Sequence, residues 1–152
     1  MIKQLENIIN KYNKEERIIW DEYFASITLL ASIRSSCNRL KVGCVLVKNN
    51  HIISMGYNGF LPGQKHESLV RNDHEQATIH AEQNAICDAA KRGIEINNSI
   101  AYITHYPCIN CFKALSAAGI KEIKFLNDYK NDILIEQIKG NINITKIIFD
   151  DK

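Results

Sequence analysis

The first third of the chain carries apolar residues at helical spacing. Its apolar positions recur three or four residues apart: Tyr23, Phe24, Ile27, Leu30 and Ala31. This spacing places the side chains on one face of a helix and predicts a helix over Trp20–Ser35. The segment before it, residues 1–17, is polar with few apolar positions, and it predicts a short helical extension packed on the outside.

The period then changes to that of strands. Val42–Val47 is a nearly continuous apolar run rich in Val, which is typical of a buried strand. Asn49-Asn50 predicts a turn, and His51–Tyr57 predicts the returning strand. The polar segment Gly59–Ile79 predicts a loop.

Helices and strands alternate in the second half of the chain. The apolar patterns predict three helices, over His80–Arg92, Cys108–Ala118 and Asp132–Lys139. They also predict three strands, over Ser99–Thr104, Glu122–Asn127 and Asn143–Phe149. This alternation indicates an α/β fold with parallel neighbouring strands, in which sites form beyond the carboxyl ends of strands and at helix N-termini.

Composition excludes several classes of function. The chain has 152 residues, which fits one domain over 1–152, and 45% of them are hydrophobic. No apolar run is long enough to cross a bilayer, and the charged N-terminal segment lacks a secretory signal, so we expect a cytoplasmic protein without a membrane partner. The net charge is only +2, which argues against a nucleic-acid partner.

The cysteine count favours metal binding or simple burial over disulfides. The chain has five cysteines, and an odd number without an export signal is not typical of a disulfide framework. Cys44 lies inside a predicted strand and Cys87 inside a predicted helix, so we expect both to be small core residues. Cys108 and Cys111 differ, because they alone have C-x-x-C spacing.

Two motifs fall at predicted helix N-termini and together predict a zinc site. The first is His80-Ala81-Glu82, and the second is Pro107-Cys108-Ile109-Asn110-Cys111. Two cysteines three apart in the first helical turn project to one side, where the positive end of the helix dipole stabilises thiolates. With His80 they make three ligands, which leaves the fourth position open, as in catalytic zinc sites.

Glu82 is the predicted proton carrier. It follows the ligand His80 by two residues, close enough to serve a reacting water without binding the metal. A carboxylate suits general base and then general acid chemistry, and the combined pattern is the signature of zinc deaminases of bases. A redox C-x-x-C pair would leave His80 and Glu82 unexplained, and a structural zinc would require a fourth protein ligand.

Over Trp20–Asp150 the chain resembles deoxycytidylate (dCMP) deaminases of the cytidine deaminase-like superfamily. The matching segments are WDEYF, RSSC, KVGCVLV, GYNG, HAEQNAI, THYPCINC and AAGIKEIKF. Nucleoside cytidine deaminases usually carry Cys in place of His80, and tRNA adenosine deaminases usually have Trp at Tyr57 and Met at Asn110. The resemblance implies a three-layer α/β/α sandwich with a mixed five-stranded sheet, and zinc-dependent hydrolysis of dCMP to dUMP and ammonia.

The resemblance also implies substrate-binding roles. Asn58 of GYNG is expected to contact the deoxyribose or base, although Asn-Gly is also a turn dipeptide. The monophosphate requires cationic donors, for which Arg39 and Lys41 are the candidates, with Arg34 as a further one. Tyr129 is a candidate to close over the substrate.

Many family members have a second zinc site, and the matching region here offers Cys37, His66 and His74. A structural zinc requires a fourth ligand, for which Glu67 and Glu75 are candidates; the alternative is an ordinary surface loop. Family members often form homo-oligomers and are often regulated by dCTP and dTTP, which the resemblance implies as effectors.

Two alternatives to dCMP deamination stay open. The first is deamination of another base, as in cytidine or tRNA adenosine. The second is a noncatalytic zinc-binding scaffold. Glu82 favours an enzyme over a scaffold, because a scaffold has no use for a carboxylate beside an open zinc position.

Overall fold

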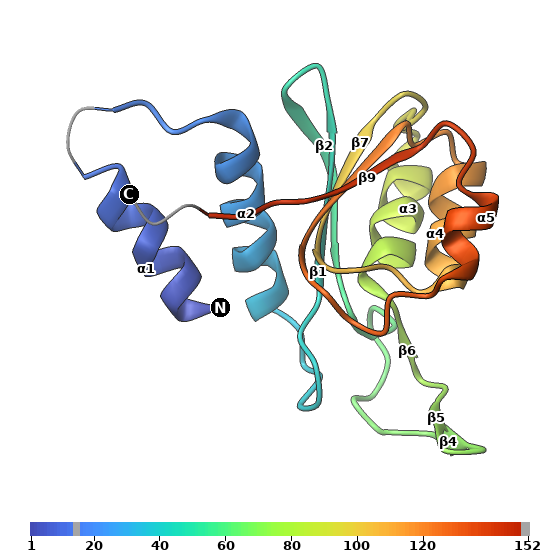
Figure 1. The fold of residues 1–152 in the computed structure, drawn as a ribbon. Coiled ribbons are helices and arrows are strands. Elements are labelled where there is room, and N and C mark those ends of the chain that lie inside the picture. Colours follow the sequence, from blue (N-terminus) through green and yellow to red (C-terminus); the bar gives the residue numbers. More distant parts are fainter. Residues whose placement is uncertain (14–15, 150–152) are drawn as a thin grey trace.

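A mixed sheet of five strands forms the centre of the molecule (Figure 1). The computed structural model describes residues 1–13 and 16–149. Along the sheet the strand order is β2-β1-β7-β8-β9: β2 (His51–Tyr57), β1 (Gly43–Lys48), β7 (Ile100–His105), β8 (Glu122–Asn127) and β9 (Asn143–Lys146). Strand β1 is antiparallel to β2 and β7, whereas β7, β8 and β9 are mutually parallel. The predicted mixed sheet is therefore confirmed.

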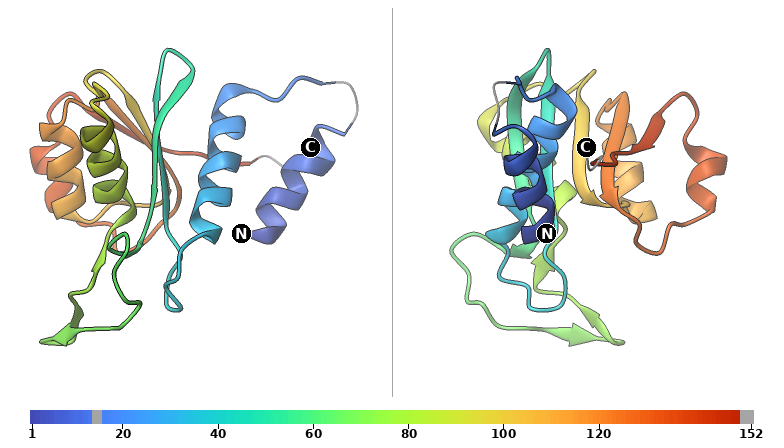
Figure 2. Two further views of the ribbon diagram at one scale, coloured as in Figure 1. Left: turned by 180° about the vertical axis from the view of Figure 1, so that it is seen from behind. Right: turned by 60° about the vertical axis from the view of Figure 1, so that its left-hand side comes forward.

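Helices cover both faces of this sheet. One face carries α2 (Trp20–Ile33), with α1 (Ile2–Lys11) outside it, and the other carries α3 (Ala81–Arg92), α4 (Ile109–Ala117) and α5 (Leu134–Ile138). Figures 1 and 2 show the three layers and the outer position of α1. This is the predicted α/β/α sandwich.

Strand β1 is apolar over residues 43–47 because both of its faces are covered. Cys44 and Leu46 belong to the core between the sheet and helices α3 and α4. Val45 and Val47 alternate with them and pack with Phe24 of α2 on the opposite face. In a strand that is buried on both sides, no side chain faces water, so polar residues do not alternate with apolar ones. This explains the continuous apolar run in the sequence.

Two glycines let helices approach the sheet closely. A Cβ atom on Gly43 would lie 2.3 Å from the carbonyl oxygen of Thr28 in α2, and one on Gly56 would lie 2.3 Å from that of Ala81 in α3. Real Cβ contacts are never this short, so only glycine fits at either position. Gly56 thereby sets the position of the first turn of α3 against the sheet.

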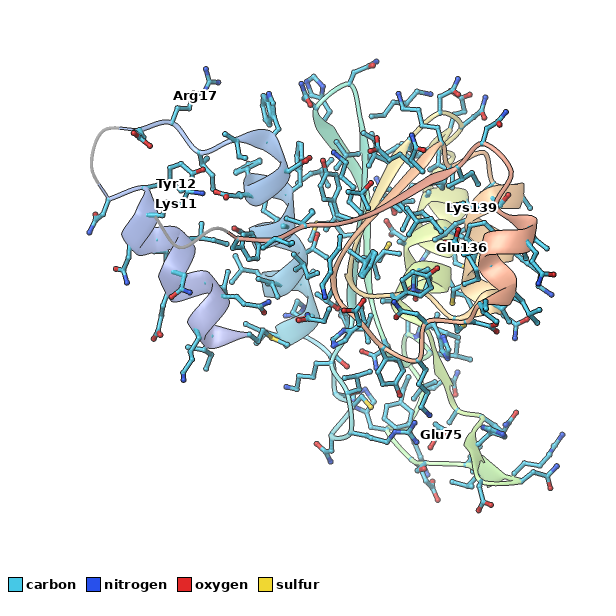
Figure 3. All side chains as sticks on the ribbon, viewed as in Figure 1. Lys11, Tyr12, Arg17, Glu75, Glu136 and Lys139 are labelled. Atoms are coloured by element: carbon cyan, nitrogen blue, oxygen red, sulfur yellow. The ribbon has the colours of Figure 1, made fainter. Side chains whose placement is uncertain are left out.

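Helix α1 is held on α2 by a buried carboxylate. Lys11 Nζ lies 2.6 Å from Glu22 Oε1, and Glu22 is only 4% exposed. Lys11 and Tyr12 lie at the C-terminal end of α1, beside α2 (Figure 3). The hydrogen bond with Glu22 raises the pKa of Lys11, which keeps the ammonium charged.

Two sequence predictions need correction here. Cys87 is exposed on α3, so it is not the core residue that we expected, whereas Cys44 is fully buried. The segment Gly59–Ile79 is not wholly a loop, because β3 (Gly59–Phe60) pairs with β6 (Thr78–Ile79), and β4 (Val70–Arg71) pairs with β5 (His74–Glu75). Among the described residues, no helix has the length and apolar character that a membrane span requires.

Candidate active site

The N-terminus of α3 presents His80. His80 is the N-cap residue in extended conformation, and a capping box joins it to Gln83: the backbone N–H of His80 donates to Gln83 Oε1 at 3.3 Å. The side chain of Asn84 donates to the carbonyl oxygen of Tyr57 at 2.9 Å and ties this turn to β2. His80 therefore has a fixed place at the start of the helix.

The N-terminus of α4 presents the two cysteines. Cys108 is the N-cap residue, and its sulfur accepts a hydrogen bond from the backbone N–H of Cys111 at 3.4 Å. Cys108 is exposed and Cys111 is fully buried. A helix N-terminus stabilises negative charge, which favours thiolates at both positions.

The three side chains meet as the motifs predict. His80 Nδ1 lies 3.6 Å from Cys108 Sγ and 3.3 Å from Cys111 Sγ. Ordinary zinc–nitrogen and zinc–sulfur bonds in a tetrahedral arrangement place N and S about 3.5 Å apart. The donor set and its spacing therefore fit zinc, and these are the residues that would hold it. Within residues 1–13 and 16–149 this is the only such group of three potential ligands.

The two sulfurs share one negative charge when no metal is bound. Hydrogen bonds from Cys111 and then from His80 lower the pKa of the Cys108 thiol to about 4. The pKa of Cys111 is raised, first by its hydrogen bond to Cys108 and then by burial. The contact with Cys108 also raises the pKa of His80. A bound cation would favour deprotonation of both thiols.

Glu82 lies beside the ligand cluster, where its side chain contacts Cys111, and it is almost completely buried. Only 4% of its surface is exposed. Burial raises the pKa of its carboxyl group, and the neighbouring Cys108 raises it further, while His80 lowers it. A carboxyl group with a raised pKa exchanges protons more readily near neutral pH, which is what a general acid–base residue requires.

Asn58 uses its amide on the protein backbone. Its Oδ1 accepts from the N–H of Val42 at 2.8 Å, and its Nδ2 donates to the carbonyl oxygen of Leu40 at 2.7 Å. Ser35 Oγ also donates to the carbonyl oxygen of Asn58. Asn58 thus positions the segment that carries Arg39 and Lys41, and direct substrate contact by its side chain stays a prediction.

The candidate phosphate-binding residues line a hollow at the carboxyl ends of β7 and β8. The hollow has a volume of about 430 Å³ and includes Arg39 and Lys41 in its lining. Tyr129 hydrogen-bonds to Arg39 and raises its pKa. Arg34 is elsewhere engaged, because its guanidinium lies over the Tyr57 ring, 5.5 Å from the centroid.

The sequence did not indicate the other residues that line this hollow: Met1, Gln4, Leu29, Asn38, Leu40, Thr104, His105 and Asn127. The rule that sites form at the carboxyl ends of strands would have indicated His105 and Asn127, which end β7 and β8. No sequence pattern indicated that Gln4 lines the hollow, because its position depends on how α1 packs against the rest of the fold.

The structure does not gather the proposed second zinc ligands. The His66 ring stacks on Phe60 with a centroid distance of 5.0 Å, and His74 lies exposed on β5. Glu75 lies on β5, in the lower part of Figure 3. It accepts hydrogen bonds from Ser68 and from two backbone N–H groups, and the Ser68 contact lowers its carboxyl pKa. Glu75 therefore shapes its own loop. Cys37, His66 and His74 do not form a ligand cluster in the part of the chain that the structure describes.

Several known proteins are similar to this chain in sequence. The family model of the cytidine and deoxycytidylate deaminase zinc-binding region matches residues 18–127. ComE operon protein 2 of Bacillus subtilis (strain 168) is 39% identical over 134 residues, which cover 86% of this chain and 71% of that protein. The deoxycytidylate deaminase of Homo sapiens is 30% identical over 128 residues, covering 78% and 71% of the two chains. That of Schizosaccharomyces pombe is 34% identical over 125 residues, covering 74% of this chain and 38% of the yeast protein.

Solved structures share the fold. The dCMP deaminase of the cyanophage S-TIM5, in complex with dCMP and dUMP, is 29% identical with a TM-score of 0.77, and the match covers 88% of this chain and 100% of that one. A tRNA:A34 deaminase has a TM-score of 0.57 at 18% identity, which is a likeness of fold alone. Together with the matched family region, these likenesses place the chain in the cytidine and deoxycytidylate deaminase family.

Proposed function

We propose that the protein hydrolyses dCMP to dUMP and ammonia. The observation that carries this proposal is the buried carboxylate of Glu82 beside a three-donor metal cluster at two helix N-termini. Relatives named deoxycytidylate deaminase, and the phage enzyme bound to dCMP and dUMP, support the choice of substrate.

The site residues divide the chemistry between them. His80, Cys108 and Cys111 would hold zinc, which when bound acts as a Lewis acid and lowers the pKa of water. Glu82 takes a proton from the water that attacks C4 of the base. It then delivers protons to N3 and to the departing amine, so that water and dCMP yield dUMP and ammonia. Glu82 is only 4% exposed, so bulk water is largely excluded from its carboxyl group and does not compete for these protons.

The substrate phosphate is assigned to the cationic hollow. Arg39 and Lys41 both lie in its lining, and charge-assisted hydrogen bonds from such groups are the strong ones. Asn58 contributes indirectly, because its amide hydrogen-bonds to the backbone of residues 40 and 42 and so positions the segment that carries both cations. Tyr129 hydrogen-bonds to Arg39 and would orient its guanidinium, and we propose that it also closes over the substrate.

We further propose a single-domain, cytoplasmic homo-oligomer with dCTP and dTTP as effectors. All five cysteines are unpaired, as a reducing compartment requires. Large apolar side chains are exposed along α2, as on a surface that another subunit covers: Trp20, Tyr23, Leu30 and Ile33. Light scattering of the purified protein tests this assembly, and adding dCTP or dTTP to the assay tests the effectors.

A substrate panel tests the function. The purified zinc-loaded protein is incubated with dCMP, CMP, deoxycytidine and a tRNA anticodon stem, and ammonia release is measured. We expect dCMP to react with the highest kcat/KM. If kcat/KM is higher for the anticodon stem or for deoxycytidine, that compound is the substrate and the proposal of dCMP is wrong. No ammonia from any of the four would favour a noncatalytic scaffold.

A further inference from the structure

The cationic hollow contains a histidine that the catalytic scheme does not use. His105 is the last residue of β7, and it lines the same hollow as Arg39 and Lys41. None of the described residues that line the hollow is acidic, so its electrostatic character favours an anion. His105 is also outside the metal cluster of His80 and the two cysteines. Its imidazole is therefore available for substrate recognition.

One nitrogen of His105 is fixed by a buried hydroxyl. Thr104 is fully buried, and its Oγ1 accepts the backbone N–H of Gly43 at 3.1 Å. The same Oγ1 lies 2.9 Å from Nδ1 of His105. The hydroxyl proton of Thr104 is not used in the contact with Gly43, and we assign it as the donor to Nδ1. A neutral imidazole that accepts at Nδ1 carries its proton on Nε2, where it is a donor.

The ring is held and kept neutral. Its centroid lies 6.0 Å from that of Tyr129 in an edge-on arrangement, so Tyr129 limits its rotation. His105 is half-buried, and burial lowers the pKa of the imidazole, which favours the neutral form near pH 7. In the part of the chain that the structure describes, no hydrogen bond engages Nε2.

We propose that His105 is a specificity-determining residue that donates a hydrogen bond from Nε2 to the 5′-phosphate of the substrate. This inference rests on the proposed function. Arg39 and Lys41 supply the charge that attracts the phosphate, while the imidazole supplies one donor of fixed direction. A fixed donor loses little conformational freedom on binding, unlike the long side chains of arginine and lysine.

Two substitutions separate this role from a structural one. A glutamine amide nitrogen takes the place of Nε2, whereas an asparagine amide takes the place of Nδ1. His105→Gln therefore keeps the donor toward the hollow, and His105→Asn keeps only the partner of Thr104. We measure kcat and KM of both variants and of wild type for dCMP and deoxycytidine, after checking zinc content and the circular dichroism spectrum.

The ratio of kcat/KM for dCMP to that for deoxycytidine is the readout. We expect His105→Asn to lower this ratio about tenfold to a hundredfold, mainly through KM for dCMP, as loss of one charge-assisted hydrogen bond predicts. His105→Gln should recover most of the ratio. If Asn instead preserves the ratio and Gln lowers it, His105 serves only to hold Thr104, and the proposal is overturned.

Binding of dUMP gives a second measurement that does not depend on turnover. Calorimetric titration of zinc-loaded protein should show weaker binding for His105→Asn than for His105→Gln. Equal affinity of both variants and wild type would also overturn the proposal. A wild-type enzyme that does not prefer dCMP would instead contradict the proposed function, so the two failures are distinguishable.

Discussion

The Sγ atom of Cys111 lies 3.3 Å from Nδ1 of His80, although 31 positions separate the two residues in the chain. His80 caps α3 and Cys111 lies in the first turn of α4, and these two helices lie side by side on the same face of the sheet (Figure 1). The zinc site is therefore a product of helix packing, and changes that displace either helix N-terminus should impair it.

Gly56→Ala should damage the site without touching a ligand. A Cβ atom there would lie 2.3 Å from the carbonyl oxygen of Ala81 and 2.5 Å from the backbone nitrogen of Ala85. Overpacking of this kind costs about 1–3 kcal/mol, and here it pushes on the turn that carries Glu82. Urea denaturation and kcat are the measurements.

Gly59→Ala is the matched control for that variant. Its new Cβ would meet only Ser36 Oγ, at an ordinary contact distance of 3.6 Å. We expect a smaller loss of stability than for Gly56→Ala. Equal losses in the two variants would show that the close approach at α3 is not the cause.

The metal count should be about one zinc per chain, because three ligands gather at only one place among the described residues. Cys111→Ser should remove most of the zinc, since it deletes a ligand. Cys37→Ser and His74→Ala should leave the zinc content of purified protein unchanged. Elemental analysis that gives two zinc per chain, with one lost in Cys37→Ser, would restore the second site.

Lys11→Met should destabilise the protein by removing the cationic partner of a buried carboxylate. Glu22 is 4% exposed, and its Oε2 atom has no hydrogen-bond partner in the structure. Loss of Lys11 removes the cationic partner of this carboxylate and leaves it the hydrogen bond with Tyr12. Thermal denaturation should show a lower midpoint for Lys11→Met than for the double variant Lys11→Met/Glu22→Gln. A double variant no more stable than the single one would contradict this reasoning.

Asp88 should make stability depend on acid pH. Its hydrogen bond from Arg92 lowers the carboxyl pKa, and Ser54 lowers it further. A carboxyl pKa that is lower in the folded state stabilises the protein above the unfolded pKa of about 3.9, and this contribution is lost as pH falls through the folded value.

Asp88→Asn should remove that part of the acid dependence. The pair is half-exposed, so we expect a loss of about 1 kcal/mol or less at pH 7, and a smaller difference from wild type at pH 3. Urea denaturation at both pH values measures it. A difference that grows on acidification would have the wrong sign.

The sequence predicted most elements because their patterns have a direct physical cause. Residues 43–47 of β1 are all apolar because helices cover both faces of this strand. The turn that follows has positive φ at both Asn49 and Asn50. A similar pair, Asn72 and Asp73, joins β4 to β5 with positive φ. It was missed because the flanking strands are two residues long and exposed, and carry no apolar alternation.

The burial of Cys87 was predicted wrongly because it was inferred from the position of Cys87 inside a helix, and not from the spacing of the neighbouring buried residues. The buried residues of α3 include Ala85 and Ala89, and Cys87 lies two positions from each, on the opposite side of the helix. The contacts of Asn58 with the backbone of residues 40 and 42 also have no sequence signature, and its contact with the substrate stays a prediction. The grouping of Cys37, His66 and His74 came from the family resemblance, and it depends on the path of a polar loop that the sequence pattern does not indicate.

Glu82→Gln tests the central claim most directly. The amide has the shape of the carboxyl group but cannot carry protons, so zinc should stay at about one per chain while kcat for dCMP falls by at least about 10²–10⁴-fold. Ammonia release from dCMP and zinc content are measured on the same preparations of variant and wild type. A variant that keeps its zinc and deaminates dCMP within about tenfold of the wild-type rate would contradict the role of Glu82, and with it the account of this site as a deaminase centre.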